Sequence, residues 1–323
     1  MPRQPVLEVR DLTVTFAGER GVARVVDGVS FDLTPGRTLG LVGESGCGKS
    51  LTALALLGLV PPPGRIAGGT VRLDGRDLLL LPEAELDAVR GRRVAMIFQE
   101  PMTALNPVFP VGDQIAEVLR VHAATPRRQA QEAAIAMMAR VGIADAGARA
   151  GDYPHQLSGG MRQRVMIAMA MICRPDVLIA DEPTTALDVT VQAQILDLML
   201  EMQAEFGTAI LFISHDLAVV SEVADEVMVM YAGRIVERSP AVSLFGAPLH
   251  PYTLGLLQSL PRVDRRTGRL PAMRGGVPDP CALPRGCRYS DRCPEVENKC
   301  RTRDPALNGA GAGRWVACVK VAP

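Results

Sequence analysis

The chain has 323 residues, and its 35 basic and 35 acidic side chains give a formal net charge of zero at pH 7. This length allows one large domain or two modest ones, and the neutral balance gives no support to a general nucleic-acid-binding surface. The longest apolar stretch, residues 51–60, is about half of the roughly 20 residues that a membrane-spanning helix needs. Since no signal segment opens the chain, we expect a cytoplasmic polypeptide that reaches a membrane only through partners.

The first elements of the chain lead to a glycine-rich loop. Residues 6–16 and 28–33 alternate apolar and polar side chains as half-buried strands do, and residues 37–42 form an apolar run. The loop that follows fits the pattern G-x-x-x-x-G-K-[ST] at every fixed position. Residues 49–59 are then expected to form a helix, ended by three prolines and a glycine.

The glycines of this loop allow backbone N–H groups to converge on phosphate oxygens at the start of the next helix. We expect Lys49 to contact the β- and γ-phosphates and Ser50 to bind Mg²⁺. A plain glycine turn before a core helix is the alternative, which the complete match disfavours. The residues predicted to surround the phosphates are Gly43, Glu44, Ser45, Gly46, Cys47, Gly48, Lys49, Ser50 and Leu51.

Strands and helices alternate in the rest of the first 240 residues, which predicts an open α/β sheet with a separate helical lobe. The compact apolar runs suit parallel strands that are buried on both faces. The expected strands are residues 94–98, 177–180 and 209–213, and the expected helical parts are residues 100–155, with regular spacing over 129–141, and residues 158–173.

Two carboxylates, Asp181 and Glu182, follow the apolar run 177–180. The carboxyl ends of parallel strands line the ligand crevice of such sheets. We therefore expect Asp181 to lie in the Mg²⁺ shell and Glu182 to be the general base that polarises the attacking water.

Together with the segment Leu157-Ser158-Gly159-Gly160-Met161, these features resemble the ATP-binding-cassette (ABC) ATPases, whose signature loop this segment matches. The resemblance implies an α/β fold: an ABC-type P-loop ATPase core, a mostly helical lobe and a small cysteine-rich C-terminal tail. The expected domains are a RecA-like core with an N-terminal β subdomain (1–98 and 175–240), a helical signature subdomain (99–174) and the tail (241–323).

The resemblance also implies roles for residues outside the glycine-rich loop. Gln99 matches the glutamine that senses Mg²⁺ and nucleotide, and His215 matches the switch histidine that contacts the γ-phosphate. Residues 185–188 are similar to the D-loop, with Thr185 where serine is more usual. Phe16 is the candidate for stacking on adenine, although a strand phenylalanine is more often a core residue. The implied Mg²⁺ ligands are Ser50, Gln99 and Asp181.

In this family the signature loop contacts ATP that another ATPase chain holds. The resemblance therefore implies that Ser158, Gly159 and Gly160 contact the γ-phosphate of the opposing chain, helped by the N-terminal end of their helix. Met161 stands where glutamine is more common, so only its backbone role is carried over. Two chains would close around two Mg-ATP, and hydrolysis would let them open.

Longer stretches resemble the ATPase subunits of bacterial dipeptide and oligopeptide importers, over nearly the whole chain. They are Gly43–Gly46, Phe98–Pro107 (which includes Glu100, Pro101, Met102 and Thr103), Leu157–Arg164 and His250–Thr253. The implied partners are a second, homologous ATPase chain, two transmembrane permeases and an extracytoplasmic binding protein, with the chain peripheral at the cytoplasmic face of the cell membrane. Nickel or another small solute stays open as cargo. A DNA-repair or ribosome-acting ABC ATPase is disfavoured because the chain has one cassette and no sustained heptads.

Five of the seven cysteines lie beyond residue 280. Cys287, Cys293, Cys300 and Cys318 could supply four thiolates to zinc or to an iron–sulfur cluster, and free thiols are the third possibility. The spacing lacks paired C-x₂-C knuckles, and the tail resembles importer ATPases that carry a [4Fe–4S] cluster, so we expect the cluster, without Cys281. We expect it to be a structural staple of the tail that leaves ATP binding unaffected.

Overall fold

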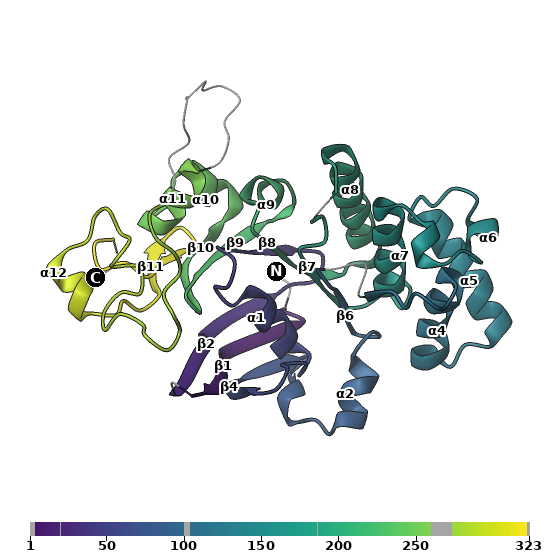
Figure 1. Cartoon of the computed structure of the whole chain (residues 1–323), viewed down its shortest axis with the longest axis horizontal. Helices are drawn as coiled ribbons and strands as arrows, with labels where there is room; N and C mark the ends of the chain where they lie inside the picture. The colour runs from purple at the N-terminus through teal and green to yellow at the C-terminus, as the bar shows by residue number, and fades with distance from the viewer. Residues whose placement is uncertain (1–3, 20, 100–103, 186, 260–272, 322–323) are drawn as a thin grey trace. The chain divides into compact units, whose positions relative to one another are not determined.

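The computed structural model describes residues 4–19, 21–99, 104–185, 187–259 and 273–321 (Figure 1). The chain forms two compact units, each described separately below. The signature-loop unit comprises residues 1–7, 33–37 and 80–212, and the phosphate-loop unit comprises residues 8–32, 38–79 and 213–323. The domain boundaries expected from the sequence stay a prediction.

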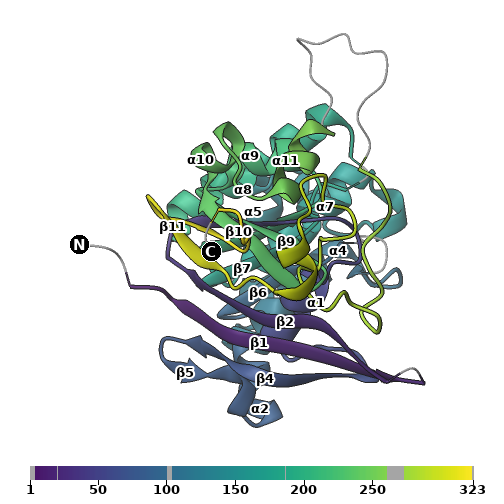
Figure 2. The same cartoon turned by 90° about the vertical axis from the view of Figure 1, so that its left-hand side faces the viewer.

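An antiparallel sheet opens the phosphate-loop unit. Its strand order is β2-β1-β4-β5, and Figure 2 shows β1 and β2 side by side. The two strands expected near the N-terminus are confirmed, whereas β4 and β5 were not predicted because glycines interrupt the pattern of β4. Gly69 is needed there, since a Cβ would lie 2.6 Å from the Arg10 carbonyl of β1. The bounds are β1 Leu7–Gly18, β2 Gly21–Leu33, β4 Gly64–Leu73 and β5 Arg76–Asp77.

A second group of strands in this unit carries the glycine-rich loop. β3 pairs in parallel with β9, and β10 pairs antiparallel with β9 and then with β12 of the tail. The tail is therefore joined to the core through a strand ladder, in which Glu237 lies opposite Val316. The strands are β3 Thr38–Val42, β9 Glu226–Tyr231, β10 Arg234–Pro240, β11 Asn308–Gly311 and β12 Arg314–Val316.

The helices of the phosphate-loop unit are short. α1 begins at Lys49 as expected but ends at Leu56, earlier than the predicted residue 59. Gly58 explains the early end, because its φ of 65° is left-handed and its N–H and that of Leu59 bond back to the last turn. The others are a 3₁₀ turn at Leu78–Leu80, α9 Leu217–Val223, α10 Ala241–Gly246, α11 Pro251–Gln258 and α12 Asn298–Thr302.

The signature-loop unit combines two parallel strands with a helical lobe. β6 pairs in parallel with β7, and every residue of β7 is buried, which confirms the strands expected there. Helices α4, α5 and α7 pack against one another (Figure 1). The bounds are α2 Glu83–Val89, β6 Val94–Ile97, α4 Val111–Ala123, α5 Arg127–Arg140, α6 Ala146–Arg149, a 3₁₀ turn at Pro154–Gln156, α7 Gly159–Met171, β7 Val177–Asp181 and α8 Val189–Phe206; the chain leaves the unit within β8, Ala209–Ser214.

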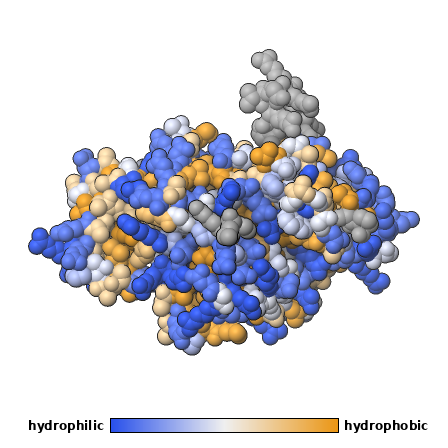
Figure 3. All heavy atoms as spheres, turned by 180° about the vertical axis from the view of Figure 1, so that it is seen from behind, coloured by the Kyte–Doolittle hydropathy of each residue, from blue (hydrophilic) through white to orange (hydrophobic). Residues whose placement is uncertain are grey.

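Within the described ranges, no helix combines the length and the apolar character needed to cross a membrane. The face drawn in Figure 3 intersperses hydrophilic and hydrophobic residues.

Candidate nucleotide site

The phosphate loop encloses the ammonium group of Lys49. Its Nζ donates hydrogen bonds to the carbonyl oxygens of Gly43, at 2.8 Å, and Glu44, at 3.1 Å, and the residue is 5% exposed. α1 begins at this lysine after Gly48, and no side chain of the described residues caps its first turn. The free N–H groups of that turn can therefore bind an anion.

Gly48 fits where no larger residue can. Its φ is 113°, and a Cβ there would lie 2.6 Å from the Val25 carbonyl oxygen and 2.9 Å from Cε of Met230. The loop is thus pressed against β2 and β9 of its own unit. A side chain at this position would push the loop outward and displace Lys49.

Cys47 is the one loop residue whose side chain carries a thiol, and it is 1% exposed. Burial raises the pKa of this thiol, although the charge of Lys49, whose Nζ lies 4.0 Å from Sγ, opposes the shift. The thiol is therefore protonated at neutral pH, which fits a packing role beneath the loop.

In the signature-loop unit the structure brings together Gln99 and Glu182. Oε2 of Glu182 accepts hydrogen bonds from Nε2 of Gln99, at 2.9 Å, and from Oγ1 of Thr185, at 3.0 Å. Gln99 follows β6 and Glu182 follows β7, two paired parallel strands, so both side chains emerge at the same sheet edge. Two donors to one oxygen fix the direction of the carboxylate.

The backbone of Glu182 has a φ of 50°, in the left-handed region. Residues other than glycine pay a conformational cost there, and such positions cluster at functional sites. Asp181, directly before it, ends β7 and is 3% exposed. Asp181 is therefore enclosed within the sheet, whereas Glu182 lies beyond the end of β7.

The signature loop begins α7. Oγ of Ser158 accepts a hydrogen bond from the N–H of Met161 at 3.3 Å, which makes Ser158 the N-cap. Gly160 packs against the start of α8, because a Cβ there would lie 2.8 Å from Cγ1 of Val191. Asp188 caps α8 through the N–H of Val191 at 2.9 Å. The signature loop and the segment expected as the D-loop therefore pack at neighbouring helix starts.

The remaining predicted nucleotide contacts belong to the phosphate-loop unit. His215 follows β8 and is exposed. Phe16 is half-buried, and its ring packs against Gly64, where a Cβ would lie 2.5 Å from Cζ. Stacking of Phe16 on adenine stays a prediction. Glu100, Pro101, Met102, Thr103 and Ala186 of the predicted motifs lie outside the described residues.

The four tail cysteines line one cavity, together with His250 and Glu295. All four are free thiols, and the N–H of Cys287 bonds to the carbonyl of Cys300 at 2.8 Å. Burial raises the pKa of Cys287 to about 11. In the described ranges, no group of three or more His, Cys, Asp or Glu side chains is arranged to hold a metal ion. The structure therefore gives no preformed zinc site and does not itself show a cluster.

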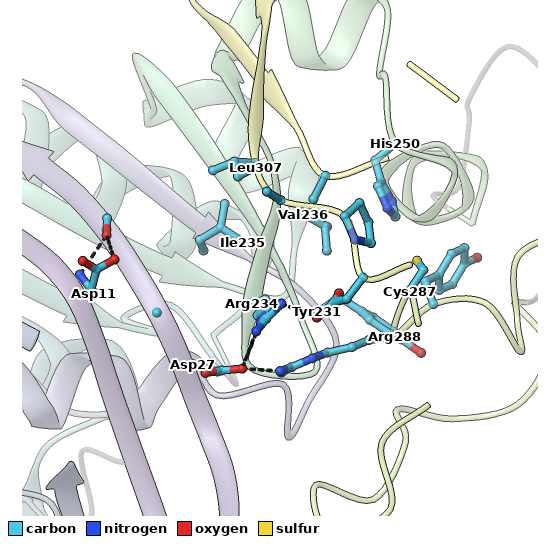
Figure 4. A pocket seen from close by; sticks show the side chains of 17 residues that line it. Asp11, Asp27, Tyr231, Arg234, Ile235, Val236, His250, Cys287, Arg288 and Leu307 are labelled. Atoms are coloured by element: carbon cyan, nitrogen blue, oxygen red, sulfur yellow. Dashed lines mark hydrogen bonds and ion pairs between the residues drawn. The ribbon is translucent and has the colours of Figure 1, made fainter. Parts of the chain in front are cut away.

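An ionic network attaches the tail to the core strands (Figure 4). Asp27 of β2 accepts hydrogen bonds from Arg288 of the tail and, at 2.9 Å, from Nε of Arg234 of β10. Arg234 also pairs with Asp304. Burial raises the pKa of Asp27, but the attraction of Arg234 and Arg288 outweighs burial, and the net shift is downward. Asp27 is thus held between an arginine of the core and an arginine of the tail.

The sequence analysis missed the residues that hold Glu44. The carboxylate of Glu44 pairs with Arg292 of the tail, and its N–H donates to the hydroxyl of Tyr252 at 2.9 Å. The tail therefore contacts the phosphate loop, while the expectation that the tail leaves ATP binding unaffected stays a prediction. Residues 250–253 carried the resemblance to importer ATPases without an assigned role, and that segment was the one signal available in the sequence.

Comparison with known proteins identifies the family of the chain. The family model "ABC transporter" matches residues 26–185, and the model "Oligopeptide/dipeptide transporter, C-terminal region" matches residues 236–300. The oligopeptide transport ATP-binding protein AppD of Bacillus subtilis is 49% identical and covers 97% of this chain and 96% of its own length. OppD of Salmonella typhimurium, an oligopeptide transport ATP-binding protein, is 49% identical over 99% of this chain and 95% of its own.

A solved dimeric bacterial ABC transporter cassette matches with a TM-score of 0.66 and 23% identity, covering 73% of this chain and 98% of that chain. This likeness confirms the expected α/β fold of ABC ATPases. The two family models and the near full-length relatives agree on one assignment. The chain belongs to the ABC transporter family, among the ATP-binding proteins of oligopeptide and dipeptide transporters.

Proposed function

We propose that the chain hydrolyses ATP to drive the import of di- or oligopeptides through a membrane transporter. As a member of its family, it is an ATPase coupled to transport. The observation that carries the proposal is the carboxylate of Glu182, which two side-chain donors hold at the end of a buried parallel strand.

Lys49 and Ser50 bind the phosphates and Mg²⁺ in this proposal. The enclosed ammonium of Lys49 exchanges its bonds to loop carbonyls for bonds to phosphate oxygens, while the N–H groups of α1 complete the anion site. Asp181 and Gln99 complete the Mg²⁺ shell, directly or through water. The neighbouring residues Gly43 to Gly48 and Leu51 surround the phosphates, and Phe16 stacks on adenine.

Glu182 accepts the proton of the attacking water. Gln99 and Thr185 hold its carboxylate in one orientation. A carboxylate fixed in this way is a more effective general base than one on a freely rotating side chain. His215 contacts the γ-phosphate and reports its loss. The role of His215 comes from the match to the family.

The proposed functional assembly contains a second ATPase chain. Ser158, Gly159, Gly160 and the backbone of Met161 contact the nucleotide of that chain. The cap formed by Ser158 takes up the N–H of Met161 and leaves the earlier N–H groups of α7, those of Gly159 and Gly160, to face the phosphate. The two chains then close on two Mg-ATP, each held between the core (1–98 and 175–240) of one chain and the signature subdomain (99–174) of the other, and they open after hydrolysis. The partner is a homologous chain or a second copy.

An apolar groove of the signature-loop unit supports docking to a permease at the cytoplasmic face of the membrane. The side chains of Met96, Phe98, Leu105, Val118 and Met169 line it, and Phe98 is 41% exposed. Such a groove accepts the apolar face of a short helix. We assign a cytoplasmic helix of one permease to it, the second permease docking on the second ATPase chain, with an extracytoplasmic binding protein acting through both permeases.

We also propose a [4Fe–4S] cluster on Cys287, Cys293, Cys300 and Cys318. The support is that all four thiols line one cavity. When bound, it would supply thiolate–iron bonds that cross-link the tail.

The proposal is tested in sealed vesicles that contain the permeases, the ATPase chains and the binding protein. ATP on the side of this chain should drive accumulation of a labelled peptide, and Lys49→Ala should abolish it. Accumulation of nickel without peptide would redirect the cargo, and ATP hydrolysis without any transport would favour a non-transport ABC ATPase.

A further inference from the structure

Glu44, the second residue of the phosphate loop, is bound by an arginine of the C-terminal tail. Nη1 of Arg292 lies 2.6 Å from Oε2 of Glu44, and Nη2 lies 2.9 Å from Oε1. The side chain of Arg292 is 7% exposed and that of Glu44 is 26% exposed. A bidentate pair with so little exposure fixes the direction of both side chains.

The guanidinium of Arg292 is itself held from several sides. Nε donates to the Arg274 carbonyl at 2.7 Å, and the group lies 5.7 Å and 5.9 Å from the ring centres of Tyr231 and Tyr289. These contacts stabilise the observed direction of the guanidinium. The residue directly precedes Cys293, so the pair connects the four-cysteine segment to the phosphate loop.

Tyr252 provides a second attachment to the same loop residue. It is 0% exposed, its hydroxyl accepts the Glu44 N–H at 2.9 Å, and its ring centre lies 4.6 Å from that of Tyr231. Nδ1 of His250 accepts the Tyr252 N–H at 3.1 Å and so fixes the start of α11. Backbone and side chain of Glu44 are therefore held by different elements.

The charge of Glu44 makes this attachment matter for nucleotide binding. An uncompensated carboxylate in a loop that binds phosphate would repel ATP, and the repulsion is strong where little water separates the charges. Arg292 neutralises the carboxylate and directs it to the tail. Glu44 therefore does not weaken the attraction between Lys49 and the phosphates.

We propose that Arg292 is a positioning residue for ATP binding, which acts through Glu44, and that Tyr252 supports it. The C-terminal tail is therefore part of the support of the phosphate loop. This inference rests on the proposed function, because it assigns the support of the same nucleotide site.

The test is Mg-ATP affinity of the full chain, measured by titration calorimetry. Arg292→Ala should weaken affinity about tenfold or more, since it leaves Glu44 charged and unpaired. Adding Glu44→Gln to Arg292→Ala should restore most of the lost affinity, because the uncompensated charge is removed. The matched control is Arg301→Ala, an arginine beside Cys300 whose pair with Asp291 lies at the surface.

Absence of ATP binding by the unmodified chain would overturn the proposed function itself. If the unmodified chain binds ATP, equal affinity in Arg292→Ala would overturn the positioning role alone. Loss of affinity that Glu44→Gln does not restore would also overturn it, because general loosening of the tail cannot be repaired at Glu44. If Arg292→Ala does not fold, Arg292→Lys serves, with a several-fold loss expected because lysine cannot make the bidentate pair.

Discussion

Glu182 and Glu44 are two carboxylates of the proposed nucleotide site that are held in opposite ways. Glu182 is held by Gln99 and Thr185, within its own unit and at the ends of paired strands. Glu44 is held by residues 208 and 248 positions away in the chain. The first arrangement follows from where strands end, while the second depends on how a distant tail folds back. The carboxylate proposed as the base is thus positioned by the ends of paired strands, whereas the carboxylate of the phosphate loop is positioned by residues of the distant tail.

The largest effect expected is at Glu182. Glu182→Gln keeps the hydrogen bonding but removes the base, so ATP turnover of the assembled transporter should fall by about 10²- to 10⁴-fold while ATP affinity is kept. Phosphate release and nucleotide affinity are measured in parallel. Glu201→Gln, an exposed change on α8, is the control. Turnover near that of the unmodified protein would show that another residue is the base.

The pH dependence of the free energy of unfolding tests the state of His250, which fixes the start of α11 next to the phosphate loop. Burial lowers the pKa of His250 to about 4, and a hydrogen bond with the Ala317 backbone opposes the shift. The unfolded chain, with an ordinary histidine pKa near 6.5, binds this proton more readily. Stability from the neutral His250 is therefore present above pH 6.5 and is lost as the pH falls toward 4, by about 3 kcal/mol in all.

The measurement is the denaturant midpoint between pH 7 and pH 4 for the unmodified chain, His250→Asn and His155→Gln. Asparagine can still cap α11 but has no proton to gain, so the acid dependence should be shallower in that variant. The exposed His155 should change nothing. Equal slopes in all three proteins would contradict the assignment of His250 as a buried neutral group.

Cys293→Ser separates the two accounts of the tail. A staple that is independent of the nucleotide site predicts unchanged ATP affinity, whereas support through Arg292 predicts a loss of several-fold, because the residue next to Arg292 is no longer fixed. Protein purified without oxygen should contain about four irons per chain before the change and fewer after it. Cys173→Ser, outside the tail, is the control for iron content and ATP affinity. Unchanged affinity after iron is lost would restore the independent staple.

Much of the fold could be predicted from the sequence because its signals are local. The fixed positions of the phosphate loop, the apolar runs that became β3, β6 and β7, and Ser158 as the cap of α7 each depend on neighbours in the chain. Gln99 and Glu182 could be brought together because parallel strands end at one edge.

The tail could not be predicted in this way. β12, which pairs with β10, has three residues, Arg314–Val316, which are too few to show a strand pattern. The partners of Glu44 come from segments rich in proline, cysteine and arginine. Charged residues follow no regular spacing there, so their pairs cannot be predicted from the sequence. Three of the four tyrosines of the chain meet beneath the loop, and only packing in three dimensions could reveal that.

The smallest effect expected is at Tyr252, and it sharpens the contrast between the two carboxylates. Tyr252→Phe keeps the ring packed against Tyr231 and removes only the hydroxyl that accepts the Glu44 N–H. A lost neutral hydrogen bond of this kind costs about 1 kcal/mol, so ATP affinity should fall about five-fold. Tyr153→Phe, in the signature-loop unit and 37% exposed, should leave affinity unchanged. If the two variants are indistinguishable in calorimetry, the backbone attachment contributes nothing, and the loop is held by the charge pair between Glu44 and Arg292 alone.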